Sequence, residues 1–205
     1  FVHIDLAISK DSAGVTVGHV PQFVDVYRGD HIEKLPVIQL DMILEVRPPR
    51  GGEIEFENIR KLIYVLRDTL KLPVKWVTFD QYQSKDSMQI MHRMGFMTGQ
   101  PSMDVDTFAY DVAKQAFYDG RVLAPDHPKA LKELLALEID AQKGKIDHPP
   151  RGSKDVADSV AGVIVGLTMR REIWSRHRIS LNQMPRSILE AKPQSKNDIT
   201  YMERL

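Results

Sequence analysis

The sequence predicts an α/β layer sandwich whose sheet combines antiparallel and parallel strands. Three strand-like segments come first along the chain, and an amphipathic helix, a fourth strand and several further helices follow them. Consecutive strands favour an antiparallel meander, whereas strands that alternate with helices favour parallel pairing. At 205 residues the chain is long enough for one substantial core, so we expect one domain with an appendage rather than two full domains.

The three N-terminal strands are predicted from alternation and from branched residues. Apolar and polar side chains alternate within residues 1–9, a period of two that is typical of a strand. Residues 9–14 contain turn formers, and residues 15–20 are the returning strand of a hairpin. After a polar link, residues 35–46 are rich in branched side chains and are predicted as the third strand.

Helical and strand patterns alternate in the middle of the chain. Residues 53–72 place apolar side chains at helical spacing, and Pro73 ends this amphipathic helix. Residues 74–80 are predicted as a short apolar strand that ends on an acid. A helix over 84–96, with Ser84 as its N-cap, follows, and its methionines at 88, 91 and 94 are expected to fill the core.

The C-terminal half is predicted to be mainly helical. A helix closes near Gly120, and residues 127–140 are either a second helix or a helix that runs into a strand. Residues 141–150 favour a hairpin with Gly144 in its turn, and an apolar helix follows over 152–167. Residues 175–205 are weakly patterned, and we expect this tail to pack on the surface or to fray.

Composition excludes several classes of function. The chain carries 28 Lys and Arg against 28 Asp and Glu, so no global positive field marks it as a nucleic-acid binder. It contains no cysteine, which excludes disulfides, zinc–thiolate sites and thiol nucleophiles. No apolar run is long enough to span a bilayer, so no membrane partner is expected. The chain starts at Phe1 inside a strand, and we therefore expect a domain of a longer polypeptide.

Known motifs for nucleotide binding and serine hydrolysis are absent from the sequence. It contains no G-x-x-x-x-G-K-[ST] phosphate-binding loop and no G-x-G-x-x-G after a strand. It also lacks the G-x-S-x-G nucleophile motif. The chemistry of the chain is therefore expected to come from other side chains.

Four aspartates form the candidate site. Asp5 lies in the first strand between apolar neighbours, and Asp80 closes the strand 74–80, where ligands gather at the carboxyl ends of strands. Asp155 and Asp158 are three residues apart and share one face at the start of the helix over 152–167. If this acidic turn meets the ends of the two strands, three or four carboxylates come together.

The helix itself carries the features that such an approach needs. Ser153 is predicted to cap its N-terminus, where the helix dipole favours a negative charge at Asp155. Gly162 and Gly166 leave room for the helix backbone to approach a sheet closely.

A cluster of this kind repels itself unless a cation neutralises it. Mg²⁺ and Mn²⁺ prefer carboxylate oxygens, and two such ions ~3.5–4 Å apart can activate water and stabilise the leaving oxygen of a phosphodiester. Three of the four aspartates also have a simpler interpretation: Asp155 as a partner of the helix dipole, Asp158 as a solvated acid and Asp80 as a turn residue. Their joint occurrence favours the metal site.

Other polar residues are weaker candidates. His3 faces the same side as Asp5 if the alternation holds, although a structural histidine is the simpler interpretation, and His148 is comparable. Arg151 and Lys154 lie beside the acids and could contact phosphate oxygens or be solvated. Basic patches at 47–52 and 169–178 could grip a DNA backbone or be plain solvated surface.

The order of these motifs resembles the C-terminal nuclease domain of the large terminase subunit of tailed bacteriophages. The segments that carry the resemblance are "FVHIDLAISKDSAGVTVGHV", "GGEIEFENIRKLIYVL", "KWVTFDQYQSKDSMQIMHRMGF" and "HPPRGSKDVADSVAGVI". It extends to about residue 170, and its most specific part is "GSKDVADSVAGV". The resemblance implies a ribonuclease H-like fold for a nuclease domain over residues 1–174, with the C-terminal tail over 175–205.

The resemblance also implies an activity and partners. The family cleaves concatemeric double-stranded viral DNA with acidic residues that bind Mg²⁺ or Mn²⁺. When the motifs of the family are matched to this sequence, they imply that the metal ligands and catalytic residues are Asp5, Asp80 and Asp155. Asp158 is implied as an additional or alternative ligand. The implied partners are an N-terminal ATPase motor domain in the full-length chain and the portal and small terminase subunit, in the cytoplasm of the infected bacterium. In the implied mechanism Asp5 bridges two ions while the other acids complete their coordination.

Two other functions stay open from the sequence. A junction resolvase or a transposase-like nuclease would share the same fold and acids. A ribonuclease H-like interaction domain would keep the scaffold and cut nothing.

Overall fold

A mixed sheet forms the centre of the molecule. The structure is a computed structural model that describes residues 1–6, 12–80, 84–103, 105–150 and 152–190. In this part of the chain the main sheet has six strands in the order β7-β6-β1-β2-β5-β8. These strands are β1 (Val2–Asp5), β2 (Ala13–His19), β5 (Ile38–Val46), β6 (Trp76–Phe79), β7 (Met97–Gly99) and β8 (Val122–Leu123).

The strand directions confirm the predicted α/β fold with a mixed sheet. β2 runs antiparallel to both of its neighbours, β1 and β5, which is the predicted meander. All other neighbouring strands of this sheet pair in parallel. Of the turn expected over residues 9–14, residues 9–11 lie outside the described residues. β2 begins at Ala13 rather than at residue 15, so the turn was predicted too long at this end.

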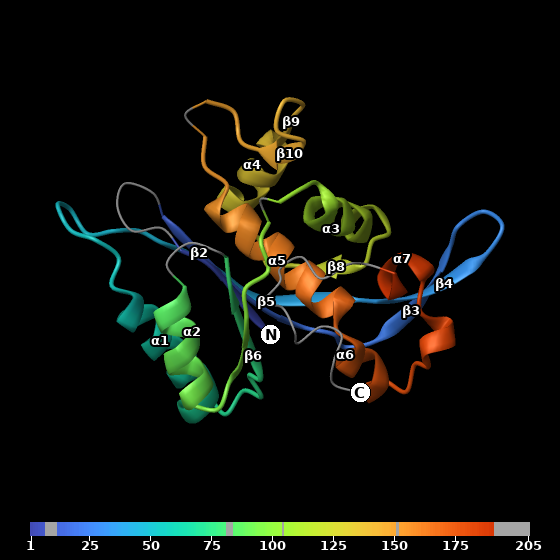
Figure 1. Ribbon diagram of the computed structural model, residues 1–205, viewed down its shortest axis with the longest axis horizontal. Helices are drawn as coiled ribbons and strands as arrows, with labels where there is room; N and C mark the ends of the chain where they lie inside the picture. The colour runs from blue at the N-terminus through green and yellow to red at the C-terminus, as the bar shows by residue number, and fades with distance from the viewer. Residues whose placement is uncertain (7–11, 81–83, 104, 151, 191–205) are drawn as a thin grey trace.

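Helices cover both faces of the sheet. α1 (Phe56–Tyr64) and α2 (Lys85–Arg93) lie together on one face, and α5 (Asp155–Met169) crosses the other with α3 (Phe108–Tyr118) and α4 (Pro128–Ala136) packed against it (Figure 1). Val2 and Ile4 of β1 belong to the apolar cluster under α1 and α2. The alternating residues His3 and Asp5 therefore face α5.

α5 is a buried helix that lies unusually close to the sheet. Every residue from Val156 to Thr168 is buried. A β-carbon at Gly162 would lie 2.1 Å from Cδ2 of His3, and one at Gly166 would lie 2.1 Å from Cζ of Phe1. Both distances are far below van der Waals contact. The predicted role of these two glycines, to let the helix approach the sheet, is confirmed.

Two elements differ from the sequence prediction in the N-terminal half. The polar link after β2 contains a separate hairpin, β3 (Phe23–Tyr27) and β4 (Ile32–Pro36), and β5 begins at Ile38 rather than at residue 35. The helix predicted over 53–72 is shorter in the structure. α1 ends at Tyr64, and a π-helical stretch, η1 (Val65–Thr69), follows it directly.

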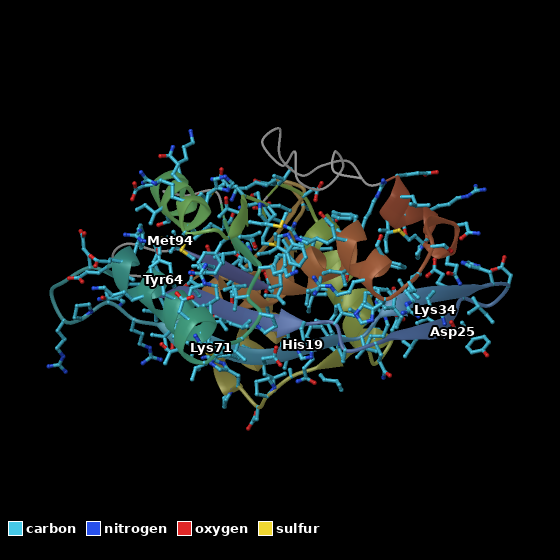
Figure 2. All side chains as sticks on the ribbon, turned by 90° about the horizontal axis from the view of Figure 1, so that it is seen from below. His19, Asp25, Lys34, Tyr64, Lys71 and Met94 are labelled. Atoms are coloured by element: carbon cyan, nitrogen blue, oxygen red, sulfur yellow. The ribbon has the colours of Figure 1, made fainter. Side chains whose placement is uncertain are left out.

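The start and the methionines of α2 also differ in part from the prediction. Ser84 stands at the N-cap of α2, but its hydroxyl makes no capping bond and instead accepts a 2.8 Å hydrogen bond from Gln100 Nε2. Met91 is fully buried and Met88 packs against the same core. Met94, labelled in Figure 2 at the end of α2, is 47% exposed, so the expectation that it fills the core is wrong.

The C-terminal half largely follows the prediction. α4 runs into β9 (Glu138–Asp140), which pairs with β10 (Lys145–Asp147) in a hairpin. Gly144 lies in its turn with φ +64°, a conformation that favours glycine. None of the described helices has the length and apolarity needed to cross a membrane.

The segment after α5 packs beside the β3–β4 hairpin. It contains α6 (Arg171–Arg176), η2 (Leu181–Gln183) and α7 (Arg186–Leu189). Trp174 is fully buried in a small apolar cluster with Leu35, Met184 and Ile188. Residues 191–205 lie outside the described residues, and the division of the chain at residue 174 stays a prediction.

The basic patch expected at 169–178 is only partly a surface. Arg170 is 1% exposed, and its guanidinium carbon lies 5.0 Å from the ring centre of Phe1 and 5.2 Å from that of Trp76. Arg170 therefore packs in the core and is not part of the basic surface predicted for this segment.

Candidate active site

Asp5 and Asp80 lie at the carboxyl ends of adjacent parallel strands, at the same edge of the sheet. Asp5 is the last residue of β1, and Asp80 directly follows β6. The backbone amide of Asp80 donates a 3.0 Å hydrogen bond to the carbonyl of Ile4. The predictions that Asp5 lies in the first strand and that Asp80 lies at the end of its strand are confirmed, and Asp5 is the last residue of its strand.

The first turn of α5 sits directly above this edge. Asp155 is the first residue of α5, and Asp158 follows one turn later. Gly14 of β2 is the cross-strand partner of Asp5, and a β-carbon on Gly14 would lie 2.0 Å from the carbonyl oxygen of Asp155. The helix therefore begins next to the strand that carries Asp5.

The charges of the other three aspartates all act on Asp5. The pKa of Asp5 is raised well above its ordinary value, first by burial and then by the charges of Asp158, Asp80 and Asp155. The positive charge of Lys154 acts in the opposite direction. Within the described part of the chain, the Asp5 carboxylate accepts no hydrogen bond from a side chain. It is therefore a partly buried acid that its surroundings do not neutralise.

Asp158 is held by two donors. Its Oδ1 accepts a hydrogen bond from the hydroxyl of Tyr110 on α3. Its Oδ2 accepts a 2.7 Å bond from Nζ of Lys154, one turn earlier. Asp158 is 3% exposed and Lys154 7%, so this is a buried ion pair rather than the solvated acid of the simpler interpretation.

Asp155 is held by two serines. Its Oδ2 accepts 2.9 Å hydrogen bonds from the hydroxyls of Ser12, just before β2, and of Ser153. These bonds tie the start of α5 to the N-terminal hairpin. Asp155 and Asp158 thus both belong to the group around Asp5, but each has its own set of partners.

Glu133 of α4 caps α5, which corrects the prediction for Ser153. The N-cap residue is Lys154, and no side-chain capping bond comes from Ser153. Instead, Glu133 Oε2 accepts 2.9 Å bonds from the backbone amides of Val156 and Ala157. Ser153 supports this arrangement, because its hydroxyl lies 2.9 Å from both Glu133 Oε1 and Asp155 Oδ2 and shares its single proton between them.

Sequence reasoning missed three residues that build the site. Glu133 and Tyr110 lie on other helices, and Lys129 contacts Glu133 Oε1 at 3.4 Å and also pairs with Glu45 of β5. The one local signal is an acid at position 133 among the apolar residues of α4, where it is 5% exposed.

The histidines are not part of the candidate site. His3 is fully buried, its Nδ1 lies 2.8 Å from the hydroxyl of Thr78, and burial lowers its pKa to about 3. It is a neutral structural residue, as its simpler interpretation predicts. His148 is exposed, and Arg151 lies outside the described residues.

The donor set suits a hard divalent cation. Carboxylate oxygens are the ligands that Mg²⁺ and Mn²⁺ prefer, and burial together with three neighbouring carboxylates raises the pKa of Asp5. No group of three or more His, Asp or Glu side chains is already arranged around a metal position in the described residues. The chemistry of the residues fits the ion, and the side chains would have to close around it.

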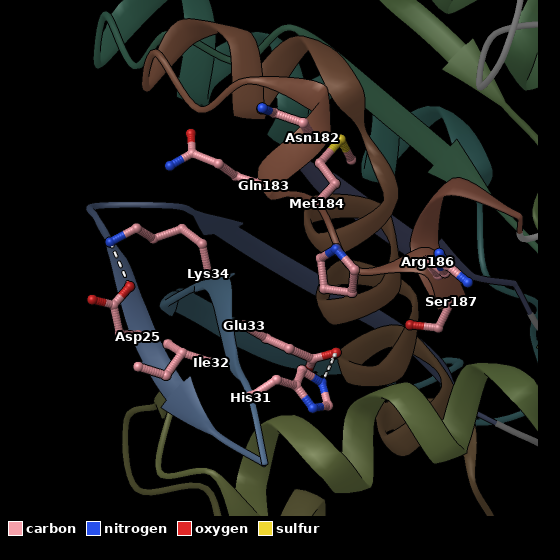
Figure 3. Close-up of a pocket in the computed structure, with 11 residues that line it drawn as sticks. Asp25, His31, Ile32, Glu33, Lys34, Asn182, Gln183, Met184, Arg186 and Ser187 are labelled. Atoms are coloured by element: carbon pink, nitrogen blue, oxygen red, sulfur yellow. Dashed lines mark ion pairs between the residues drawn. The ribbon is translucent and has the colours of Figure 1, made fainter. Parts of the chain in front are cut away.

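A separate pocket lies between the β3–β4 hairpin and the segment after α6 (Figure 3). Its volume is about 620 Å³, and its polar lining includes Lys34, His31, Glu33 and Arg186. An ion pair of 2.6 Å joins Lys34 to Asp25 across the hairpin. None of the four aspartates lines this pocket, so it is not part of the candidate active site.

Comparison with known proteins identifies the class of fold. No model of a protein family matches the chain, and no curated protein matches it significantly by sequence. The mixed sheet with helices on both faces is an α/β fold, and a solved structure shares it.

That structure is the crystal structure of the large terminase nuclease from thermophilic phage G20c. The TM-score is 0.58 with 12% sequence identity, and the match covers 82% of this chain and 81% of that chain. The resemblance to terminase nucleases is therefore confirmed at the level of the fold.

Proposed function

We propose that this chain is a metal-dependent endonuclease domain that hydrolyses phosphodiester bonds of double-stranded DNA during viral genome packaging. The observation that carries the proposal is the group of four carboxylates around Asp5, at the strand ends of a ribonuclease H-like sheet. The fold shared with a terminase nuclease supports the same assignment.

In this proposal the aspartates bind the metal and the surrounding residues fix their positions. Asp5, Asp80 and Asp155 would hold Mg²⁺ or Mn²⁺, with Asp158 as an additional or alternative ligand. A bound ion would supply the chemistry that activates water and stabilises negative charge on the leaving oxygen. Glu133 and the two serines orient the turn that carries Asp155, and Tyr110 orients Asp158.

The proposed partners follow from the same assignment. The substrate is concatemeric double-stranded DNA in the cytoplasm of an infected bacterium. An ATPase motor domain would precede this domain in the full-length chain, and the portal and small terminase subunit would complete the packaging complex. The low formal charge of the chain suits a nuclease whose grip on DNA comes largely from such partners.

Plasmid cleavage tests the proposal directly. Supercoiled plasmid incubated with the protein and Mn²⁺ is expected to be nicked and then linearised, and EDTA is expected to stop the reaction. Asp5→Asn should lower the rate roughly 100-fold or more, because several kcal/mol of stabilisation from the bound ion is lost. Asp126→Asn serves as the matched control, because Asp126 is an exposed acid just before α4. Its activity is expected to be unchanged.

The outcomes separate this function from its rivals. Full activity in Asp5→Asn would show that the site assignment is wrong. Strong preference for branched over linear DNA would identify a junction resolvase. Intact DNA after long incubation, with no Mn²⁺ binding by calorimetry, would identify a non-cutting interaction domain.

A further inference from the structure

The loop over residues 47–52 leaves the sheet at the same edge as the candidate active site. β5 and β1 both pair antiparallel with β2, so they run in the same direction and end at the same edge. In the register of these strands Asp5 lies opposite Gly14, and Gly14 lies opposite Glu45. The three residues therefore form one row across the sheet, and the loop begins two residues beyond this row.

Arg47, the first residue of this loop, turns back toward the face that carries Asp5. Leu44 and Val46 pack in the apolar cluster under α1 and α2, so Glu45 between them faces the side of α5, as Asp5 does. Nη2 of Arg47 lies 2.7 Å and its Nε 2.8 Å from Glu45 Oε2. Neighbouring strands lie ~4.8 Å apart, so the backbones of Glu45 and Asp5 are about 10 Å apart in this row.

Two arginines of the loop are accessible to a ligand. The side chain of Arg47 is 74% exposed, and an exposed ion pair contributes little to stability, so a phosphate can replace Glu45 at Arg47 with little loss. Arg50 is exposed and makes no ion pair within the described residues. The amide of Gly52 donates a 3.0 Å hydrogen bond to the carbonyl of Pro49, which closes a turn around Arg50, and the loop extends away from the sheet before α1 (Figure 1).

We propose that Arg47 and Arg50 bind phosphates of the DNA backbone beside the bond that is cut. This inference rests on the proposed nuclease function and adds a substrate contact to it. Phosphates of one strand follow each other every ~3.4 Å along the duplex axis, so a contact about 10 Å from Asp5 lies about three nucleotides from the bond held at the carboxylates. The planar guanidinium of arginine matches a phosphate and can donate two parallel hydrogen bonds to it.

The contact acts through two guanidinium groups rather than through a broad positive field. Glu53 and Glu55 follow the loop and are exposed, so the charges of this segment balance. Phosphate contacts of this kind position the duplex and carry no sequence information. The loop is therefore expected to hold the backbone in register with the carboxylates without selecting a sequence.

DNA affinity measured without cleavage tests the contact. Fluorescence anisotropy of a labelled duplex is recorded in EDTA over a range of salt concentrations. Arg47→Gln and Arg50→Gln are each expected to weaken binding about three- to tenfold and to lower the slope of log K against log salt by about 0.9, the value for one phosphate. Arg93→Gln, at an exposed arginine at the end of α2, should leave affinity and slope unchanged. In cleavage assays with Mn²⁺ the loss should fall on KM rather than on kcat.

A double variant separates a phosphate contact from simple charge neutralisation. Arg47→Gln also leaves the charge of Glu45 without its partner, and this charge would repel DNA. With Glu45→Gln added, the double variant is expected to bind DNA more weakly than Glu45→Gln alone. Equal affinities of these two proteins would show that Arg47 only neutralises Glu45, and would overturn the inference.

The outcomes distinguish this inference from the proposed function. If the unaltered protein cuts DNA with Mn²⁺ while both arginine variants keep its affinity and salt slope, only this inference fails. If the unaltered protein neither binds nor cuts duplex DNA, both fail. Weaker binding with a smaller salt slope in both variants, beside an unchanged Arg93→Gln, supports the contact.

Discussion

At the scale of single residues, Asp5 combines partial burial with like-charged neighbours. Burial and the charges of Asp158, Asp80 and Asp155 raise its pKa, so the folded protein binds a proton at Asp5 more tightly than the unfolded chain does. The folded protein is therefore stabilised by the protonated form of Asp5. This contribution to stability is lost as the pH rises from the ordinary pKa of 3.8 through the raised pKa of the folded state.

Asp5→Asn is therefore expected to stabilise the metal-free protein at pH 7. Each unit of the pKa difference corresponds to about 1.4 kcal/mol, and the gain should vanish below about pH 3.8, where Asp5 is protonated in both states. Urea unfolding in EDTA at several pH values measures it, with Asp126→Asn as the control. A gain that does not depend on pH would contradict this account, as would a loss. Mn²⁺ should stabilise the unaltered protein more than the variant.

Tyr110 is expected to contribute to stability through one buried hydrogen bond. Tyr110→Phe keeps the ring and removes only the donor to Asp158. A hydrogen bond to a charged group contributes about 1.5–3 kcal/mol, and Lys154 remains bound to the same carboxylate, so a loss of about 1–3 kcal/mol is expected. Chemical denaturation measures it. Tyr118→Phe, at a residue that is 78% exposed on the same helix, should change little; equal stabilities of both variants would exclude the role given to Tyr110.

At the scale of elements, the contact of α5 with β1 depends on Gly162. Gly162→Ala places a β-carbon 2.1 Å from the His3 ring, so the helix or the strand must move. We expect a loss of about 1–3 kcal/mol in unfolding free energy, typical of overpacking, although alanine favours a helix by about 1 kcal/mol over glycine.

A second substitution identifies the cause of this loss. His3→Ala removes the ring that the new β-carbon would meet, so the double variant should be more stable than the sum of the two single effects predicts. Thermal and chemical unfolding of the three variants measure the coupling. Strict additivity would mean that His3 does not limit the approach of α5.

Local patterns were sufficient to predict where the acids lie in the elements. Asp5 and Asp80 belong to strands with clear apolar patterns, and the buried run after Asp155 marks α5 as a core helix. The contacts between elements were not predictable in this way. Glu133 is 22 positions before Asp155, and its pattern on α4 does not reveal that it reaches the N-terminus of another helix.

The β3–β4 hairpin was not predicted for a different reason. Its residues face partly to solvent, so the burial pattern that defines the main strands is weak there. Arg28 at its tip pairs with Asp119 after α3 at 2.7 Å, a contact between segments 91 residues apart. Such long-range support is visible only once the chain is folded.

At the scale of the whole molecule, the equal numbers of acidic and basic residues limit DNA affinity. The 28 Lys and Arg are balanced by 28 Asp and Glu, and Arg170 lies inside the core, so no net positive charge favours contact with phosphates. We expect the isolated chain to bind duplex DNA with a Kd at the weak end of ~10⁻⁴–10⁻⁶ M at physiological salt. Fluorescence anisotropy in EDTA over a range of salt concentrations measures this, and nanomolar affinity at physiological salt would refute it.

Gly14 carries no functional group, yet the spacing within the candidate active site depends on it. Two of the four carboxylates stand on the sheet and two on a helix, and the carbonyl of Asp155 fills the space where any other residue at position 14 would place its β-carbon. A single added methyl group there would separate the acids of the helix from those of the strands. The spacing of the four carboxylates in the candidate active site thus depends on the absence of a β-carbon at position 14.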